Sequence, residues 1–547
     1  MPRTDMVTAS TRALRLAPLA LLPLASPAAA QGPLQAPPAP AANPTTPEKA
    51  VLGKILFWDE QLSSDGTIAC GTCHIPGVGG GDPRIDGPAQ HPGPDGVGLT
   101  ADDIFGSAGL SRSAQDGQYA MDSTFGHGVR VTGRVTPSNI TGAYFPRLFW
   151  DGRAEGAFED PLTGAVVIPF GGALEEQSIG PILNDVEMGY ESRTWAEVTE
   201  RLERVEPLAL ASNVPFDMSA ALLADPTYPD LFEAAFGTDE ITPVRIGFAL
   251  AAYQRTLVPD QAKFDDVMRG QANFTPAENR GFGAFRSPGS RCDACHTPPL
   301  FADGSFRNLG LRPIGEDSGR FEVTGNPADR GRFKVPSLRN VALRDRFFHT
   351  GAPGIDDLGD VFVFYDQDGG AFPQNKDPLL NNLNVPPPVR ADLVAFMNTL
   401  TDPRVASESY PFDRPTLWSE RAQPNPAPTG TGAVVGHSLV ALGVTATSPA
   451  VAGNEGFRIG LTNGPPGELT TFATRFTSGP DVGSLRPFVP LFRNVFVIDA
   501  DGMATWVAPS VTDPALRGIA FQGQWVVRDA TAPGGAARSE LVSVTIE

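Results

Sequence analysis

The sequence predicts a mainly α protein in which two tandem helical domains are followed by a small C-terminal β-sandwich module. Three observations predict this class. The pattern Cys-x-x-Cys-His occurs twice, at residues 70–74 and 292–296. A helix pattern opened by Thr-Pro precedes each copy. Beyond residue 433, short β-branched stretches separated by turn residues replace the helical patterns.

The repeated pattern is the attachment signature of a c-type haem. Two thiols one helical turn apart can form thioethers with the two vinyl groups of one porphyrin, and the histidine that follows can ligate the iron from one side. All four cysteines of the chain lie in these motifs. We therefore expect two covalently bound haems c, attached through Cys70, Cys73, Cys292 and Cys295 and ligated by His74 and His296.

Three other uses of paired cysteines fit the sequence less well. A thioredoxin-like redox pair needs no histidine after it and stands in a βαβ context, which the pattern here lacks. A zinc site would place the two pairs about 15–20 residues apart. Structural disulfides would not favour a histidine after both pairs. Two haem domains of the cytochrome c type are therefore the preferred interpretation.

The composition narrows the class of protein further. The chain has 547 residues, which suggests two to four domains, and its 54 prolines and 59 glycines predict long loops. The formal net charge of −20 argues against nucleic acid or an anionic membrane as a partner. The charge suits a protein that meets a small redox protein. We expect no membrane span, because the apolar stretches are too short.

The first 30 residues have the pattern of a secretory signal peptide. Arg12 and Arg15 precede an apolar stretch from Leu16 to Leu24, and Ala28 to Ala30 resemble a cleavage site. We expect cleavage near Ala30 and a periplasmic or secreted protein, because bacteria attach haem to this motif outside the cytoplasm. Residues 31–46 are rich in Pro and Ala and form a predicted linker.

Both haem motifs follow the same helical arrangement. Thr46 and Thr275 are predicted N-caps, and each is followed by Pro. In each helix a glycine lies four residues before a phenylalanine, at Gly53–Phe57 and at Gly281–Phe285. This similarity suggests an internal duplication. One haem domain is expected at residues 47–255 and a second at residues 256–418.

Hydrophobic periodicity assigns the remaining segments. Helices are expected at residues 192–210, 243–257 and 388–400, and residues 79–136 are expected to be mostly loop. A second linker, at residues 419–433, leads to the β-sandwich accessory module at residues 434–547. The strands of this module are expected at residues 439–445, 457–461, 495–498 and 524–527, with a turn at residues 499–502.

Five stretches carry a resemblance to a known family. They are Leu52–Phe57, Leu148–Arg153, Leu174–Gln177, Asp185–Gly189 and Phe333–Asn340. With these stretches in this order around two haem motifs, the chain resembles the bacterial di-haem cytochrome c peroxidases, including their MauG-like members. The resemblance runs from about residue 52 to residue 402. It implies an enzyme that reduces hydrogen peroxide to water with electrons from a small cytochrome c or a cupredoxin.

The resemblance implies roles for three side chains around a peroxidatic first haem. Glu187 matches the acid–base carboxylate over that haem, Gln177 matches its amide partner, and Trp150 matches the tryptophan between the haems. Breaking an O–O bond needs a proton moved from one oxygen to the other, which a carboxyl group in a haem pocket can do. Taken alone, Glu187 would be a surface or capping carboxylate and Trp150 a core residue. The neighbouring Glu175 and Glu176 rank below Glu187.

The resemblance also implies further metal ligands. His127 matches a histidine that caps the first haem in resting members, and His91 in the same loop is a rival. Tyr365 stands where peroxidases carry the methionine of the second haem and where MauG-like members have a tyrosine; alternatively, it only packs at a helix end. Many members hold calcium through an asparagine that follows an arginine. Here Val135 follows Arg134, so calcium is doubtful.

Two other functions stay open at this point. One is a MauG-like di-haem oxidase that modifies a partner protein through a high-valent iron state, which Tyr365 favours. The other is a non-catalytic di-haem electron-transfer protein, against which Glu187 and Gln177 argue. A homodimer is also left open.

Overall fold

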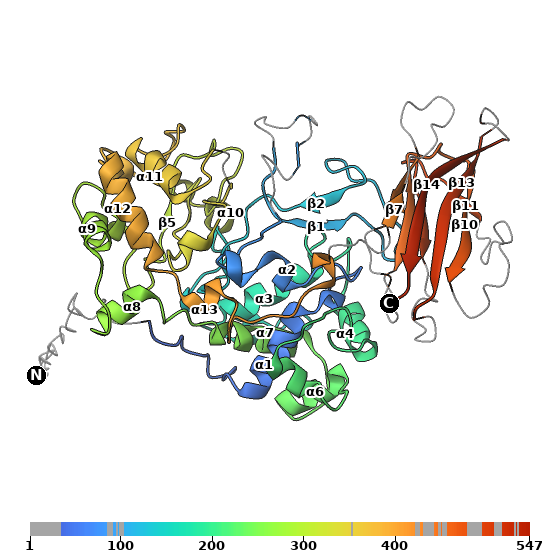
Figure 1. Ribbon diagram of the computed structural model, residues 1–547, viewed down its shortest axis with the longest axis horizontal. Coiled ribbons are helices and arrows are strands. Elements are labelled where there is room, and N and C mark those ends of the chain that lie inside the picture. Colours follow the sequence, from blue (N-terminus) through green and yellow to red (C-terminus); the bar gives the residue numbers. More distant parts are fainter. Residues whose placement is uncertain are drawn as a thin grey trace, which may run out of the picture.

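The computed structural model describes residues 34–84, 91–93, 97, 103–351, 354–421, 427–429, 442–446, 450, 457–478, 495–507, 517–529, 532 and 535–547. The predicted signal peptide at residues 1–30 lies outside these residues, as does most of the predicted linker at 419–433. The protein combines helices and sheets (Figure 1). Within the described ranges, no helix is long and apolar enough to cross a membrane.

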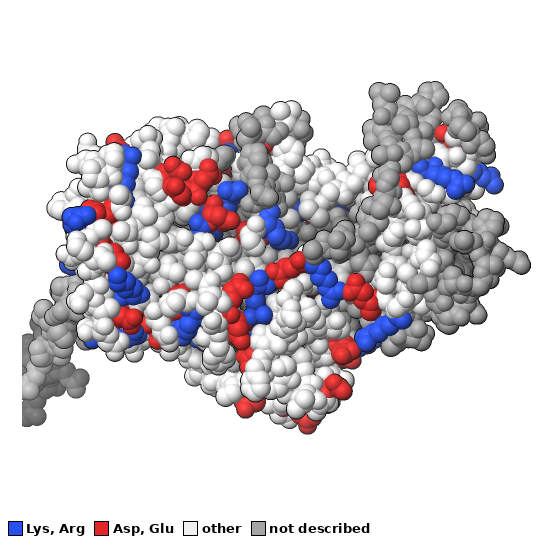
Figure 2. Space-filling model, viewed as in Figure 1, with Lys and Arg blue, Asp and Glu red and all other residues white. Residues whose placement is uncertain are grey.

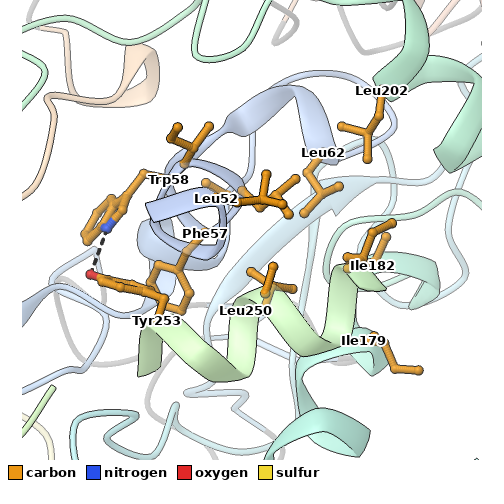
Figure 3. Packing of buried hydrophobic residues seen from close by; sticks show 14 of the residues in the cluster. Leu52, Phe57, Trp58, Leu62, Ile179, Ile182, Leu202, Leu250 and Tyr253 are labelled. Atoms are coloured by element: carbon orange, nitrogen blue, oxygen red, sulfur yellow. Dashed lines mark hydrogen bonds between the residues drawn. The ribbon is translucent and has the colours of Figure 1, made fainter. Parts of the chain in front are cut away.

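The helix before the first haem motif packs on a helix almost 200 residues later. Helix α1 spans Pro47–Trp58 and α7 spans Pro243–Thr256. A Cβ atom built on Gly53 would lie 1.8 Å from the carbonyl oxygen of Ala249, so only glycine permits this approach of the two helices. In Figure 3, Phe57 and Trp58 face Tyr253, whose hydroxyl accepts a 3.2 Å hydrogen bond from the Trp58 indole nitrogen.

The helix before the second haem motif repeats this packing. Helix α9 spans Pro276–Phe285 and α12 spans Pro387–Asn398. A Cβ atom on Gly281 would lie 2.0 Å from the carbonyl oxygen of Asp392. The N-caps are also the predicted ones, since Thr46 and Thr275 each accept from the backbone N–H three residues later. The two copies thus share a capped helix and a glycine at a close helix crossing.

The remaining helices surround these two pairs. They are α2 (Cys70–Cys73), α3 (Ala173–Leu183), α4 (Trp195–Arg204), α5 (Phe216–Ala221), α6 (Tyr228–Phe236), α8 (Lys263–Met268), α10 (Phe321–Thr324), α11 (Leu358–Asp366) and α13 (Pro403–Ala406). The helix expected at residues 192–210 is only α4. It ends early because Pro207 disfavours helical geometry at Glu206.

Short strands lie within the helical part of the chain. The segment expected to be mostly loop contains β1 (Ala108–Ser111) and β2 (Val129–Val131), which pair antiparallel. Two further two-stranded pieces are β3 (Phe158–Glu159) with β4 (Val166–Ile168), and β5 (Phe306–Arg307) with β6 (Phe333–Lys334). They are too short to carry a periodic sequence signal.

The C-terminal part forms two antiparallel sheets. One has the order β11-β10-β13-β14-β7 and the other the order β12-β9-β8. Their strands are β7 (Ala427–Thr429), β8 (Gly443–Thr445), β9 (Arg458–Thr462), β10 (Leu469–Ser478), β11 (Val495–Val497), β12 (Ala504–Val507), β13 (Ala520–Arg528) and β14 (Ala536–Thr545). One core that includes Phe457, Trp506 and Trp525 joins both sheets. The expected turn is present, with Gly502 N–H donating to the Asp499 carbonyl.

These C-terminal strands stand at one end of the molecule and α9–α12 at the other, with the α1–α7 region between them (Figure 1). The loop between β1 and β2 touches the C-terminal sheets: Tyr119 N–H donates to Thr505 Oγ1 at 3.0 Å, and the Arg458 guanidinium lies 4.4 Å from the Tyr119 ring centroid. Figure 2 shows acidic and basic side chains next to one another on this face of the molecule, in keeping with ion pairs such as Arg280–Asp392.

Candidate haem sites

Each Cys-x-x-Cys-His motif lines its own cavity. The first cavity is bounded by Cys70, Cys73 and His74, together with Phe57 from α1 and side chains from α3 and α7. Residues Cys70–Cys73 of this motif form a single helical turn, α2, at whose start Thr72 Oγ1 accepts a hydrogen bond from Ala69 N–H at 2.8 Å. Both thiols therefore face the same hollow.

The second cavity is built in the same way. It is bounded by Cys292, Cys295 and His296, with Phe285 at the end of α9 and Met397 on α12. Phe285 takes the place that Phe57 has in the first cavity. The spacing of glycine and phenylalanine noted in the sequence therefore sets one aromatic ring at each cavity.

The two motif histidines are oriented by backbone carbonyls. His74 Nδ1 lies 3.1 Å from the Gly80 carbonyl oxygen, and His296 Nδ1 lies 2.9 Å from that of Phe301. A carbonyl can only accept, so Nδ1 carries the proton and Nε2 keeps its lone pair. Burial lowers the pKa of His74 to about 4 and also lowers the pKa of His296. Both imidazoles are thus neutral and suited to iron ligation.

The four cysteines also fit covalent attachment of haem. None of them is in a disulfide. Each pair shares its cavity with a histidine whose Nε2 is available. The residues present therefore fit a haem c in each cavity.

Gln177 and Glu187 line the first cavity together with the haem motif. Gln177 lies on α3, and Glu187 lies just after α3, where the Asn184 side chain accepts hydrogen bonds from the N–H groups of Val186 and Glu187 at 2.9 and 3.1 Å. Burial raises the pKa of the Glu187 carboxyl, and the positive charge of Arg153 opposes that shift. The Glu187 carboxyl therefore stays protonated to a higher pH than a carboxyl group in water does.

The other two carboxylates of this region have structural partners. Glu175 is fully buried and pairs with Arg255 at 2.8 Å. Glu176 accepts from Gly156 N–H at 3.4 Å. Neither lines the first cavity, which Glu187 does.

Trp150 borders both cavities. Its side chain is 8% exposed, and its indole N–H donates to the Val135 carbonyl at 2.7 Å. Its own carbonyl accepts from the N–H of Lys334 in β6 at 2.7 Å. Hydrogen bonds at both the ring and the backbone fix this tryptophan between the two cavities.

The other predicted ligands divide into two groups. Tyr365, on α11, lines the second cavity, and burial raises the pKa of its phenol. His127 lines neither cavity; it lies where the acidic Asp499 and Asp501 influence it. His91 packs edge-on against Phe125 with 4.7 Å between ring centroids. The roles of both histidines as ligands remain predictions.

Arg134, beside the position where a calcium ligand was considered, is surrounded by carboxylates. Its guanidinium pairs with Asp151 and with Asp317, each at 2.6 Å. Among the described residues, no group of three or more His, Cys, Asp or Glu side chains could hold a metal ion. The positive charge that faces Asp151 and Asp317 is therefore that of Arg134.

Most residues that line the second cavity were not singled out from the sequence, among them Lys334, Arg344 and His349. Lys334 lies inside one of the stretches that carry the resemblance, so the sequence held a signal for it. Arg344 and His349 lie outside those stretches, and only the tertiary structure brings them to the cavity.

Known proteins match this chain over most of its haem-bearing part. The sequence model described as di-haem cytochrome c peroxidase matches residues 47–273. The methylamine utilization protein MauG of Methylorubrum extorquens is 32% identical over 367 residues, which span 66% of this chain and 81% of that protein. The cytochrome c551 peroxidase of Nitrosomonas europaea is 30% identical over 328 residues, spanning 59% and 74%.

A crystal structure of a MauG-like protein associated with microbial copper homeostasis aligns with a TM-score of 0.48 and 25% identity, covering 69% of this chain and 96% of that one. From the sequence relatives, the chain belongs to the di-haem cytochrome c peroxidase family. It is a haem-containing oxidoreductase of the peroxidase type, and its cofactors are two c-type haems.

Proposed function

We propose that this protein is a periplasmic di-haem peroxidase that reduces hydrogen peroxide to water with electrons from a small cytochrome c or a cupredoxin. The observation that carries this proposal is the first cavity. There Glu187 and Gln177 border the same space as Cys70, Cys73 and His74. The names of relatives such as the cytochrome c551 peroxidase support the same reaction.

The domain organisation belongs to the proposal. The N-terminal haem domain covers residues 47–255, the C-terminal haem domain covers residues 256–418, and a β-sandwich accessory module covers residues 434–547. The repeated helix pairs α1–α7 and α9–α12 support the tandem haem domains. Two antiparallel sheets around one core support the module.

In peroxide reduction, the side chains of the first cavity must transfer a proton and orient the peroxide. One H₂O₂ takes up two electrons and two protons to give two waters. The haems, when bound, supply the iron and the electrons. Glu187 takes a proton from one peroxide oxygen and returns it to the other, and the Gln177 amide orients the oxygen by hydrogen bonding. A carboxyl group whose pKa is raised by burial suits this exchange near neutral pH.

The indole of Trp150 is placed for electron transfer, because it borders both cavities. In this proposal the second haem domain receives electrons from the donor protein. The aromatic ring then bridges the space toward the first cavity. Its two hydrogen bonds keep it at this position.

A second candidate function is the modification of a partner protein by a MauG-like oxidase. One observation favours it: Tyr365, rather than a methionine, lines the second cavity from α11. Relatives named MauG are as similar to this chain as those named peroxidase. The two candidates differ in the substrate that gives up electrons, which is a small redox protein in one case and the modified partner in the other.

Substitution of the carboxylate tests the proposed function. In Glu187→Gln, the amide cannot exchange a proton, so we expect peroxide turnover to fall about 10²–10⁴-fold with both haems still attached. In the wild type, we expect turnover to rise with pH through a pKa above the usual value for glutamate, because the carboxylate must accept the first proton. Steady-state peroxidase assays from pH 5 to 8 measure both effects.

Glu176→Gln is the matched control. It removes a carboxylate of the same region that does not line the cavity, so turnover should stay within a factor of about two of the wild type. Wild-type turnover in Glu187→Gln would remove this residue from the reaction.

A further inference from the structure

The second cavity is lined by more positive than negative side chains. The charged residues at its wall are Arg291, Arg307, Lys334, Arg339, Arg344 and Asp377. Two of the arginines are neutralised: Arg339 pairs with buried Asp265 at 2.8 Å, and Arg307 pairs with Asp377 at 2.9 Å. The positive charges of Arg291, Lys334 and Arg344 are not balanced in this way, although Arg291 donates to the Asn381 carbonyl and is partly exposed.

Lys334 is buried with little compensation. Its side chain is 7% exposed in β6, and its ammonium group donates only a long 3.3 Å bond to the Arg147 carbonyl. It also lies 4.4 Å from the ring centroid of Phe145. Asp151 is the acidic group that acts on it, but that carboxylate already binds Arg134 and Arg153. Burial accordingly lowers the pKa of Lys334 to about 7.

Arg344 donates to two backbone carbonyls, and one of its terminal nitrogens has no acceptor. Its Nη2 donates to the Thr136 carbonyl at 2.9 Å, and its Nε donates to the Arg346 carbonyl at 3.3 Å. Its Nη1 is buried and makes no hydrogen bond. Within the described part of the chain, neither Arg344 nor Lys334 forms an ion pair. Removing a cationic group from water is costly unless an anion joins it.

His349 adds a further nitrogen without a hydrogen-bond partner, after Arg344 Nη1, to the wall of the second cavity. Its side chain is 6% exposed, and its ring stacks on Phe333 with 3.5 Å between centroids. It also meets Trp150 edge-on at 6.2 Å. Its Nε2 is buried without a hydrogen-bond partner. An unsatisfied polar atom in such a place indicates a missing partner.

We propose that Lys334, Arg344 and His349 form a carboxylate-binding site for the propionates of the second haem. A haem c has two propionate carboxylates, which can accept hydrogen bonds from the ammonium of Lys334 and the free Nη1 of Arg344, and the imidazole offers a further hydrogen bond. Lys334 lines both cavities and Arg344 also acts on His74, but Arg344 and His349 line the second cavity and not the first, so we assign the site to the second haem. The inference rests on the second cavity holding a haem, as the family membership of the chain requires.

The site has a consequence for the redox potential of the second haem. A positive charge next to a propionate disfavours the ferric state, which carries one more positive charge than the ferrous state. Removing the charge of Arg344 should therefore lower the midpoint potential of the second haem. The same change should alter the vibrations of the propionate whose hydrogen bond is lost.

The test compares Arg344→Gln with Arg344→Lys in the full-length holoprotein. Potentiometric titration followed by electron paramagnetic resonance measures the potential of each haem, and resonance Raman spectroscopy measures the propionate-bending band. We expect Arg344→Gln to lower the second haem's potential and shift the band, and Arg344→Lys to restore most of the potential. Arg280→Gln is the control, because it removes the same charge from an exposed ion pair on α9 outside both cavities.

His349→Phe keeps the stacked ring and removes both nitrogens, so it should shift the propionate band with little change in potential. Loss of the second haem from Arg344→Gln, with its retention in Arg344→Lys, would also support the site. Unchanged potential and band in both Arg344→Gln and His349→Phe would overturn it. Wild-type protein with a single haem by pyridine haemochrome assay would instead overturn the haem assignment itself, and this site with it.

Discussion

His74 and His296 have the same surroundings in two different parts of the chain. His74 donates its Nδ1 proton to the Gly80 carbonyl, six residues further on, and His296 donates its Nδ1 proton to the Phe301 carbonyl, five residues further on. The loop after each haem motif therefore does more than connect helices: it selects the tautomer that leaves Nε2 for iron. The haem motif itself could be predicted from the sequence, but these carbonyl partners could not, because they depend on the path of the following loop.

Glu60 allows a prediction about pH at the same scale. It is 1% exposed and accepts hydrogen bonds from the N–H groups of Trp418 and Ser419 at 2.7 and 3.0 Å. Burial raises its pKa from 4.5 to about 7, so the folded protein favours the protonated form. The resulting stability is present below pH 4.5 and is lost as the pH rises to about 7, by roughly 3 kcal/mol.

Thermal melting at pH 5 and pH 8 checks this prediction. The wild type should lose more stability over this range than Glu60→Gln, whose amide does not titrate. An equal loss in both proteins would mean that Glu60 is not the group responsible.

The helix pairs α1–α7 and α9–α12 show what the local sequence can and cannot predict. The capped starts of α1 and α9 were predicted from Thr-Pro, and the bounds of α7 and α12 from their periodicity. The partner of each helix was not predictable, because the contacts of Gly53 and Gly281 join residues more than 100 positions apart. The strands β1 and β2 were missed because such short segments have no clear period.

Substitution of these glycines tests the repeated helix crossing. Gly53→Ala and Gly281→Ala would each bring a methyl group within about 2 Å of a carbonyl oxygen, so each should destabilise the protein by about 1–3 kcal/mol. Each should also disturb the spectrum of the haem in its own cavity more than that of the other haem. Thermal melting and ferric absorption spectra measure these effects.

Gly283→Ala is the control on the same helix as Gly281. Nothing lies within 4 Å of a Cβ atom at that position, so we expect a gain of about 0.5–1 kcal/mol from the helix propensity of alanine. A loss of stability as large as that of Gly281→Ala would show that α9 tolerates no side chain at either position.

The first cavity is connected to the C-terminal sheets on one side and to the second cavity on the other. The C-terminal sheets hold the loop between β1 and β2 through Thr505 and Arg458. The two strands that flank this loop contribute Ala108, Gly109 and Val131 to the wall of the first cavity. On the other side, Trp150 separates this cavity from the second one. The predicted site residues Glu187, Gln177 and Trp150 thus lie together, whereas His127 lies toward the C-terminal sheets.

The central claim is that peroxide reacts in the first cavity with electrons that arrive from the second. Stopped-flow mixing of hydrogen peroxide with the fully reduced protein tests it most directly. We predict that the ferrous absorption of both haems is lost at a rate proportional to the peroxide concentration, and that Glu187→Gln slows this loss about 10²–10⁴-fold. Ferrous haems that persist in the presence of peroxide, or that are oxidised equally fast in Glu187→Gln, would contradict the account.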